Sequence, residues 1–150
     1  MLNQTLRLVQ VTSSAEGFTD LTAELNREIA ASGLDLGVAT LVCQHTSCSL
    51  TINENADPRV LHDLAAYLRA LVPEQGFRSL SGEGERGRYA HDDEGPDDMP
   101  AHIRTALTAT SLQLSFQRGR LVLGTWQAVY LWEHRARSHR RRLSLHLIGA

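Results

Sequence analysis

The sequence predicts a single α+β domain over residues 1–150, with two or three helices and about six or seven strands. Three observations support this class. Apolar residues recur at helical spacing in some stretches, they alternate with polar residues in others, and no linker or internal repeat divides the chain. The composition, 42% hydrophobic and 21% charged, is that of an ordinary globular protein. A chain of this length buries about two-thirds of its unfolded surface.

The first two elements are a strand and a helix. The stretch TLRLVQVT, residues 5–12, alternates and predicts a strand. The stretch FTDLTAELNREIAASG, residues 18–33, has its leucines and isoleucine at helical spacing. Asp20 suits the N-cap of this helix, and Gly33 suits its end.

The segment CQHTSCSLTINENADP, residues 43–58, predicts a strand that runs directly into a helix. From position 42 onward apolar and polar residues alternate, which is typical of a strand with one buried face. The apolar members are Val42, Cys48, Leu50 and Ile52, and the polar members are His45, Ser47, Ser49 and Thr51. Asp57 and Pro58 suit the N-cap and first turn of the helix that follows, and Pro73 ends it.

The two cysteines are expected to be reduced. In an extended strand, the five-residue step from Cys43 to Cys48 separates them by about 16 Å and places them on opposite faces. A disulfide requires Cα atoms within about 7 Å. We therefore expect no disulfide, and we expect Cys43 to be simply buried.

The remainder of the chain predicts a loop, a short helix and further strands. Residues 73–99 hold five glycines and a dense acidic run, which indicates a long loop. Its GEGERG stretch, residues 82–87, matches G-x-G-x-x-G but follows no convincing strand, so we reject a dinucleotide site. A short helix is expected after Pro100. The expected strands after it are SLQLSF, residues 111–116, LVLGTWQAVYLWEH, residues 121–134, and LSLHLIG, residues 143–149.

Charge and hydropathy narrow the classes of function. A formal net charge of -2 argues against a broad electrostatic interaction with nucleic acid. No apolar run approaches the roughly 20 residues that span a bilayer, and polar residues interrupt the first ten positions. We therefore expect a cytoplasmic protein without nucleic-acid or membrane partners.

Three histidines are candidate metal ligands. His45 lies on the polar strand face, His91 in the acidic loop and His102 in the helix after it. Three imidazoles from separate elements can hold zinc or another divalent metal and leave a position open for water or substrate. The alternative is that these are three unrelated polar histidines.

The acidic residues also allow two interpretations, one structural and one functional. Residues 91–98, HDDEGPDD, contain five acids, and Glu54 and Asp57 follow the histidine strand. Like charge at this density must be solvated, or neutralised by a cation or by arginines. A solvated loop is the simpler interpretation. The alternative is that carboxylate oxygens bind magnesium together with a substrate phosphate.

Arginines, an aromatic residue and hydroxyl groups supply candidate substrate contacts. The basic tail includes Arg135 and Arg141, which would suit bidentate phosphate binding. Trp126 and Gln127 offer a flat face and an amide for a ring, although Trp126 would serve equally as core. Ser47 lies on the same polar strand face as His45.

Three motifs, QHTSCSLTINENADPRVLHDL, YAHDDEGPDDMPAHI and GRLVLGTWQAVYLWEHR, together resemble the YjbQ-like family. The resemblance covers almost the whole chain, and the DDMPAHI and GTWQ…EHR stretches are similar to its enterobacterial-type branch. It implies a compact α+β fold with a mixed β-sandwich, assembled as a homotrimer. It also implies a secondary thiamine-phosphate synthase activity, which joins a pyrimidine pyrophosphate to a thiazole phosphate.

The resemblance also assigns site residues. The histidines that match family motifs are His45, His91 and His102, the acids are Glu54, Asp57 and Asp98, and the other matches are Trp126, Gln127, Arg135 and Arg141. Relatives usually carry HTSASL, so Cys48 replaces a small residue and is not expected to be chemically required. Relatives of this branch also tend to have glycines near Ser138 and His139, so the backbone of that turn is expected to differ.

These observations lead to three hypotheses. The first is a small metal-dependent enzyme that acts on a phosphorylated metabolite. In it His45, His91 and His102 hold the metal, Glu54 or Asp98 acts as the catalytic general base or orients the metal ligands, and Ser47, Trp126, Gln127, Arg135 and Arg141 bind substrate. The second is a non-catalytic trimeric module that binds a metal or a small phosphorylated ligand. The third is a structural role, in which the histidines and acids join subunits.

Overall fold

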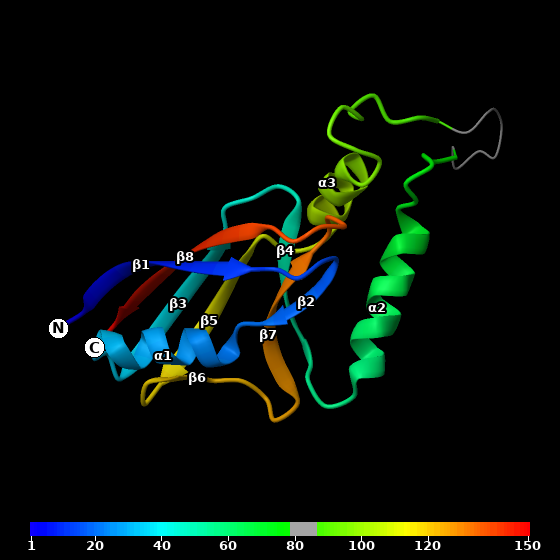
Figure 1. Cartoon of the computed structure of the whole chain (residues 1–150). Helices are drawn as coiled ribbons and strands as arrows, with labels where there is room; N and C mark the ends of the chain where they lie inside the picture. The colour runs from blue at the N-terminus through cyan, green and yellow to red at the C-terminus, as the bar shows by residue number, and fades with distance from the viewer. Residues whose placement is uncertain (79–86) are drawn as a thin grey trace.

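The computed structural model describes residues 1–78 and 87–150, and it contains two antiparallel sheets and three helices (Figure 1). The five-stranded sheet has the order β1-β8-β3-β5-β6, with β1 (Asn3–Thr12), β8 (Arg140–Gly149), β3 (Leu36–Cys43), β5 (Ser111–Gln117) and β6 (Arg120–Leu121). The three-stranded sheet has the order β2-β7-β4, with β2 (Gly17–Asp20), β7 (Gln127–Glu133) and β4 (Cys48–Glu54). The predicted α+β class is therefore confirmed.

The helices are α1 (Thr22–Ser32), α2 (Pro58–Leu71) and α3 (Asp98–Leu107). Figure 1 shows α2 standing to one side of the strands, with α3 near the end of β4 and the chain termini close together. The termini meet because β1 and β8 pair along their whole length, from Asn3–Gly149 to Thr12–Arg140.

The ends of the helices follow local capping chemistry. The Asp57 carboxylate accepts a hydrogen bond from the backbone of Arg59, and Pro58 occupies the first turn of α2, as predicted. The Asp20 carboxylate accepts from the Thr22 amide, although Leu21 occupies the N-cap position of α1. Gly33 ends α1 in the left-handed conformation, with φ 75°. The last helix begins at Asp98, before Pro100, because a proline is compatible with the first turn.

The core lies where the inner faces of the two sheets meet α1. Leu145 and Leu147 of β8, Leu131 of β7, and Leu25 and Ile29 of α1 are fully buried there. Burying one such side chain contributes about 1.5–3 kcal/mol. The opposite face of the five-stranded sheet carries exposed apolar residues, namely Leu6, Leu8, Leu36, Val38 and Ile148.

The predicted continuous strand from position 42 to 52 is wrong. β3 ends at Cys43 in the five-stranded sheet, and β4 begins at Cys48 in the three-stranded sheet. Residues 44–47 connect the two sheets, and the alternation runs through this connection without marking it. A period of two shows that a side chain faces the core, but it does not show to which sheet the residue belongs.

Two further differences concern short strands. The prediction missed β2, which has only four residues, so eight strands are present in the described part of the chain. The expected strand over residues 121–134 is instead the two-residue β6 and the longer β7, with a turn in which the Gln127 amide donates to Gly124 O. Very short strands carry too few residues for a periodic signal.

The long loop before α3 is confirmed where the structure describes it, with one bridge between Phe77 and Gly87. All but the last residue of the GEGERG stretch lies outside the described residues. None of the helices described is long and apolar enough to cross a membrane.

Candidate metal centre

Three side chains converge where the acidic loop enters α3. His91, Asp98 and His102 each offer one ligand atom, and these atoms lie within 4.8 Å of one another. His91 Nε2 lies 2.7 Å from Asp98 Oδ2, and His102 Nε2 lies 3.3 Å from Asp98 Oδ1. The two imidazole rings are 5.3 Å apart. The arrangement therefore places two nitrogens beside one carboxylate.

The local fold explains this convergence. Asp98 and His102 are four residues apart in α3, which places both on the same face of the helix. His91 comes from the loop that precedes the helix. Asp98 is 1% exposed, whereas the side chains of His91 and His102 remain partly open to solvent. The carboxylate is thus at the floor of the cluster and the imidazoles are at its open side.

The orientation of His102 is set by a backbone carbonyl. Its Nδ1 lies 2.8 Å from Thr46 O in the connection between β3 and β4. A carbonyl only accepts, so Nδ1 carries a proton, and in the neutral ring the lone pair would lie on Nε2, which faces Asp98. This is the arrangement usually found for an imidazole that binds a metal.

Arg135 pairs with two of the five acids in the loop. Its Nε donates to Asp97 Oδ2 at 2.9 Å, its Nη1 to Asp98 Oδ1 at 3.0 Å, and its Nη2 to Glu94 O at 3.0 Å. Although burial of Asp97 opposes ionisation, the hydrogen bond from Arg135 holds the pKa of this carboxyl below its ordinary value. The other three acids, Asp92, Asp93 and Glu94, are exposed to solvent.

One oxygen in this cluster is buried and accepts no hydrogen bond of standard geometry. Asp98 Oδ1 accepts from Arg135, whereas the nearest polar group to Oδ2 in the described structure is His91 Nε2 at 2.7 Å. Such a buried oxygen is costly unless a cation or proton donor satisfies it. The residues present therefore fit a divalent cation, which would be held by Asp98 Oδ2 and the two Nε2 atoms.

His45, the third expected ligand, is not part of this cluster. Its Nε2 accepts a hydrogen bond from the Arg142 backbone amide at 2.8 Å, so the lone pair is already used. Burial, with help from the positive charge of Arg141, lowers the pKa of His45 and keeps its ring neutral. The three-histidine arrangement is therefore replaced by two histidines and Asp98, because the chain turns away at residues 44–47.

Arg141 forms a buried ion pair with Glu133 and also donates a hydrogen bond to Ser47. Arg141 Nε donates to Glu133 Oε1 at 2.8 Å, its Nη2 also contacts Glu133 Oε2, and Nη2 donates to Ser47 Oγ at 3.0 Å. Burial of Glu133 opposes its ionisation, but the hydrogen bonds from Arg141 and Ser13 lower its pKa. With Arg141 only 4% exposed, its expected contact with a substrate phosphate is not available in this geometry.

The remaining predicted residues lie at the other end of the β4–β7 ladder. Cys48 pairs with Glu133 at one end and Glu54 pairs with Gln127 at the other. Six residue steps at about 3.3 Å separate these ends by about 20 Å. Trp126, next to Gln127, is 64% exposed. The chain therefore does not bring this group to the metal cluster.

The side chains at this second end form local contacts. Glu54 Oε2 accepts from the Asp57 amide at 3.2 Å, just before α2. Gln127 Oε1 accepts from the Gly124 amide at 2.8 Å. The Trp126 carbonyl accepts from the Asn55 amide, which joins the two connections. Glu54 is thus tied to the start of α2 and has no contact with His91 or His102 in the described structure.

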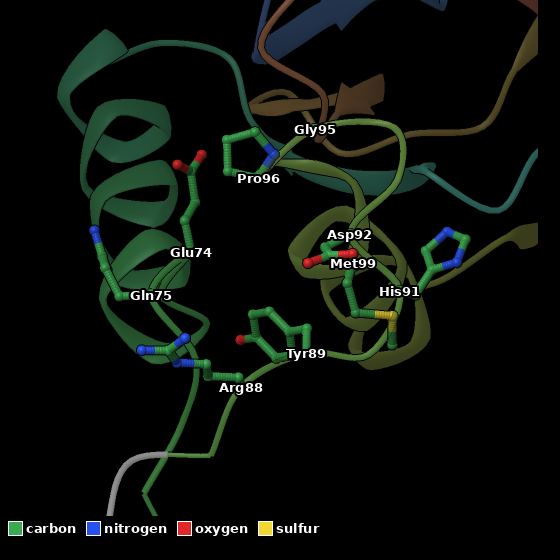
Figure 2. Close-up of a pocket in the computed structure, with 9 residues that line it drawn as sticks. All are labelled: Glu74, Gln75, Arg88, Tyr89, His91, Asp92, Gly95, Pro96 and Met99. Carbon is green, nitrogen blue, oxygen red and sulfur yellow. The ribbon is translucent and has the colours of Figure 1, made fainter.

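A cavity of about 380 Å³ adjoins the cluster. Figure 2 shows Tyr89, Met99 and Asp92 around it, with Glu74 from the segment after α2 on the opposite side. The His91 ring lies at its edge and turns away from the hollow (Figure 2). Of the three cluster residues, His91 is the one that lines the hollow.

The sequence prediction did not identify the buried Glu133 and His134. His134 is 1% exposed and forms a 2.8 Å hydrogen bond with Ser49, while burial and the nearby charge of Arg104 lower its pKa to about 3. The stretch YLWEH contains a signal for them, since charged residues directly after an apolar run often end a buried strand. Both residues lie at the metal-cluster end of β7.

Comparisons with known proteins identify the relatives of this chain. A sequence profile described as "UPF0047 protein YjbQ-like" matches residues 7–150. UPF0047 protein sll1880 from Synechocystis is 44% identical over 95% of this chain and 90% of that protein. UPF0047 protein YjbQ from Escherichia coli O157:H7 is 38% identical over 95% and 96%.

Solved structures agree with the sequence comparison. A protein of the yjbq/upf0047 family from Clostridium acetobutylicum has a TM-score of 0.78 and 31% identity, covering 94% of this chain and 98% of that chain. A conserved hypothetical protein from Thermus thermophilus has a TM-score of 0.75 and 32% identity, covering 93% and 97%. The fold, the motifs and these matches together show that the chain belongs to the YjbQ-like UPF0047 family.

Proposed function

We propose that the protein is a metal-dependent enzyme that acts on a small phosphorylated metabolite. The observation that carries the proposal is the carboxylate of Asp98, which is buried, has one oxygen without a hydrogen bond of standard geometry and lies beside two imidazoles. His91, Asp98 and His102 would hold the metal. Two imidazoles and a carboxylate suit zinc or another divalent transition metal and leave positions open. When bound, the metal would polarise a phosphoryl oxygen or activate a water molecule.

The surrounding residues would prepare this ligand set. The Thr46 carbonyl holds the Nδ1 proton of His102, so Nε2 is available as a ligand. Arg135 donates to Asp98 Oδ1 and leaves Oδ2 as the free ligand atom. Its positive charge also offsets the repulsion between Asp97 and Asp98. Arg135 therefore acts as a positioning residue in this proposal.

In this proposal a different arginine binds the phosphate of the substrate. The Arg135 and Arg141 guanidinium groups already pair with carboxylates. Arg137 lies with Arg135 and His139 around a hollow of about 360 Å³, and no ion pair is formed by its side chain within the described residues. Exposed guanidinium groups bind phosphate through paired N–H donors. Arg137, with the unused N–H groups of Arg135, would hold the phosphate of the substrate.

The secondary thiamine-phosphate synthase activity implied by the family resemblance is the specific reaction to test. It requires pyrophosphate to leave, which a hard cation such as magnesium assists through oxygen ligands. A site with two imidazoles suits a borderline metal and a hydrolytic reaction better. Magnesium would therefore enter with the oxygens of the substrate rather than occupy the histidine cluster alone.

A homotrimer is part of the proposal. The outer face of the five-stranded sheet exposes Leu6, Leu8 and Ile148, and α2 exposes Tyr67 and Leu71. Such large exposed apolar surfaces usually mark contacts with other chains. Assembly also offers a way for the Trp126 end of one chain to approach the metal cluster of another, since about 20 Å separates them within one chain.

A non-catalytic trimeric module that binds a metal or a small phosphorylated ligand is the second candidate. One observation favours it. Of the two expected catalytic acids, Asp98 is among the metal ligands and Glu54 lies at the far end of the ladder. Neither is placed to move a proton at the cluster within one chain. A trimer that supplied Glu54 from a neighbouring chain would restore the enzyme hypothesis.

Elemental analysis of the purified protein tests the proposal. We expect about one zinc or other divalent transition metal per chain. His102→Ala and Asp98→Asn should each remove it, whereas His45→Ala should retain it because His45 binds a backbone amide instead. The surface variant His62→Ala is the matched control.

Two results would contradict the metal assignment. One is a wild-type protein that stays metal-free when zinc is supplied. The other is loss of the metal in His45→Ala with full retention in His102→Ala. Product formation from phosphorylated substrates by the loaded protein then separates the enzyme from the binding module.

A further inference from the structure

Two thiols meet at the point where the chain crosses between the sheets. Cys43 ends β3, Cys48 begins β4, and their Sγ atoms lie 3.2 Å apart. Both are free, with 5% and 0% of their surface exposed. The expectation of opposite faces and a separation of about 16 Å is wrong, since it assumed one extended strand. The connection at residues 44–47 brings the two side chains together instead.

The backbone holds both cysteines in this position. The Cys43 amide donates to Thr110 O at 2.8 Å, and the Leu50 amide donates to Ala109 O at 2.7 Å. Both strands are therefore attached to the same short segment after α3. A disulfide bond has a length of about 2.0 Å, so the sulfurs need to approach by about 1 Å.

The two sulfurs differ in their acidity. The hydrogen bond with Cys48 lowers the pKa of Cys43, and the positive charge of Arg141 acts in the same direction against the effect of burial. The same pairing, together with burial, raises the pKa of Cys48. These directions favour Cys43 as the nucleophile and Cys48 as the second thiol. A nucleophilic thiol beside a second thiol is the usual arrangement of a redox-sensitive pair.

We propose that the Cys43–Cys48 dithiol is an oxidation site that hydrogen peroxide converts into a disulfide within one chain. The Cys43 thiolate attacks one peroxide oxygen, the O–O bond breaks, and a sulfenic acid and hydroxide form. The Cys48 sulfur then attacks the Cys43 sulfur and displaces hydroxide, while the Cys48 proton completes a water molecule. In sum, two thiols and one peroxide give one disulfide and two waters. Peroxide is small enough to reach sulfurs that larger oxidants cannot contact.

Oxidation would link the two sheets covalently beside the metal cluster. The resulting ring encloses residues 44–47, which include Thr46, the residue whose carbonyl orients His102. The reduced and oxidised forms would therefore differ in how firmly this carbonyl is held. The inference depends on the positions of the two sulfurs and stands whether or not a metal binds.

Intact-mass analysis with thiol alkylation tests the proposal. The full-length protein is treated with a small excess of hydrogen peroxide, unfolded and alkylated. We expect the mass to fall by about 2 Da and both thiols to become blocked from the alkylating reagent. Dithiothreitol should restore both thiols. Trypsin should yield one internally linked peptide, since no arginine or lysine separates the cysteines.

Variants supply the matched controls. Cys48→Ala should not lose mass, and its remaining Cys43 should gain about 16 or 32 Da as sulfenic or sulfinic acid. Cys43→Ala is the second variant, and we expect its Cys48 to react far more slowly. The proposal is overturned if both wild-type thiols remain alkylatable, if each cysteine is oxygenated separately, or if disulfides form only between chains.

Discussion

The two ends of the β4–β7 ladder differ in how their polar groups are satisfied. At the Cys48–Glu133 end the Glu133 and Asp98 carboxylates are buried and paired with arginines, and Asp98 Oδ2 lies 2.7 Å from His91 Nε2. At the Glu54–Gln127 end the side chains are more open to solvent, and Trp126 is exposed. Burial makes an unsatisfied oxygen costly, and the metal proposed for this cluster would satisfy the one at the first end. The polar groups at the second end are more open to solvent, so leaving them without a protein partner costs little free energy.

The largest loss of stability should come from breaking the buried Arg141–Glu133 pair at the Cys48–Glu133 end of the ladder. Arg141→Met leaves the Glu133 carboxylate buried without its bidentate partner. We expect a loss of about 3–5 kcal/mol in the free energy of unfolding, measured by urea titration. The double variant with Glu133→Gln should recover part of this loss. An equal loss from Arg137→Met, whose side chain is unpaired in the described structure, would contradict the assignment.

A variant of Arg135 distinguishes residues that would bind the metal from a residue that only positions them. Arg135→Lys keeps the charge but loses the fork that contacts Asp97 and Asp98 together. We expect zinc affinity to fall about 10–100-fold, less than with removal of a ligand such as His102. Competition with a chromophoric chelator measures this. Unchanged affinity would mean that Arg135 does not orient the cluster, and Gln127→Ala serves as the control from the other end.

Acidification should lower the free energy of unfolding through His134, which lies at the Cys48–Glu133 end of the ladder. Burial lowers the pKa of His134 to about 3, below its ordinary 6.5, so between these values the unfolded chain binds the proton and the folded chain does not. Its contribution is complete above about pH 6.5 and is lost progressively as pH falls toward 3. We expect a loss of about 2 kcal/mol in unfolding free energy between pH 7.5 and 5.

His134→Gln is the variant for comparison, because its side chain does not titrate while it retains a hydrogen-bonding group near Ser49. Its unfolding free energy should fall by less over the same pH range, and His45, whose pKa is also lowered, should account for part of the remaining slope. Equal slopes for the two proteins would show that another group causes the acid sensitivity.

The smallest effect on stability is expected at the second end. Trp126→Ala removes a side chain that is 64% exposed, so the unfolding free energy should change by no more than about 0.5 kcal/mol. If Trp126 stacks on a heterocycle, binding of a phosphorylated ring compound should weaken several-fold in the assembled protein. Thermal unfolding and calorimetric titration measure the two effects. A large loss of stability would mean that Trp126 is part of a subunit contact.

The amino-acid sequence alone was sufficient for the elements whose cause is local. The helix cap at Asp57, the stop at Gly33 and the strand over β8 depend on residues that are close together along the chain. Residue type and the family motifs also singled out His91, Asp98 and His102 as candidates, and the structure places the three side chains together.

Only the tertiary structure decided which of these residues share a site. The turn at residues 44–47 directs His45 to a backbone amide, brings Cys43 to Cys48 and leaves Asp98 as the third partner of the two histidines. Strand register separates Glu54 and Gln127 from that cluster by the length of the ladder. Such long-range contacts depend on which sheet each strand joins, and alternation along the chain carries no information about that choice.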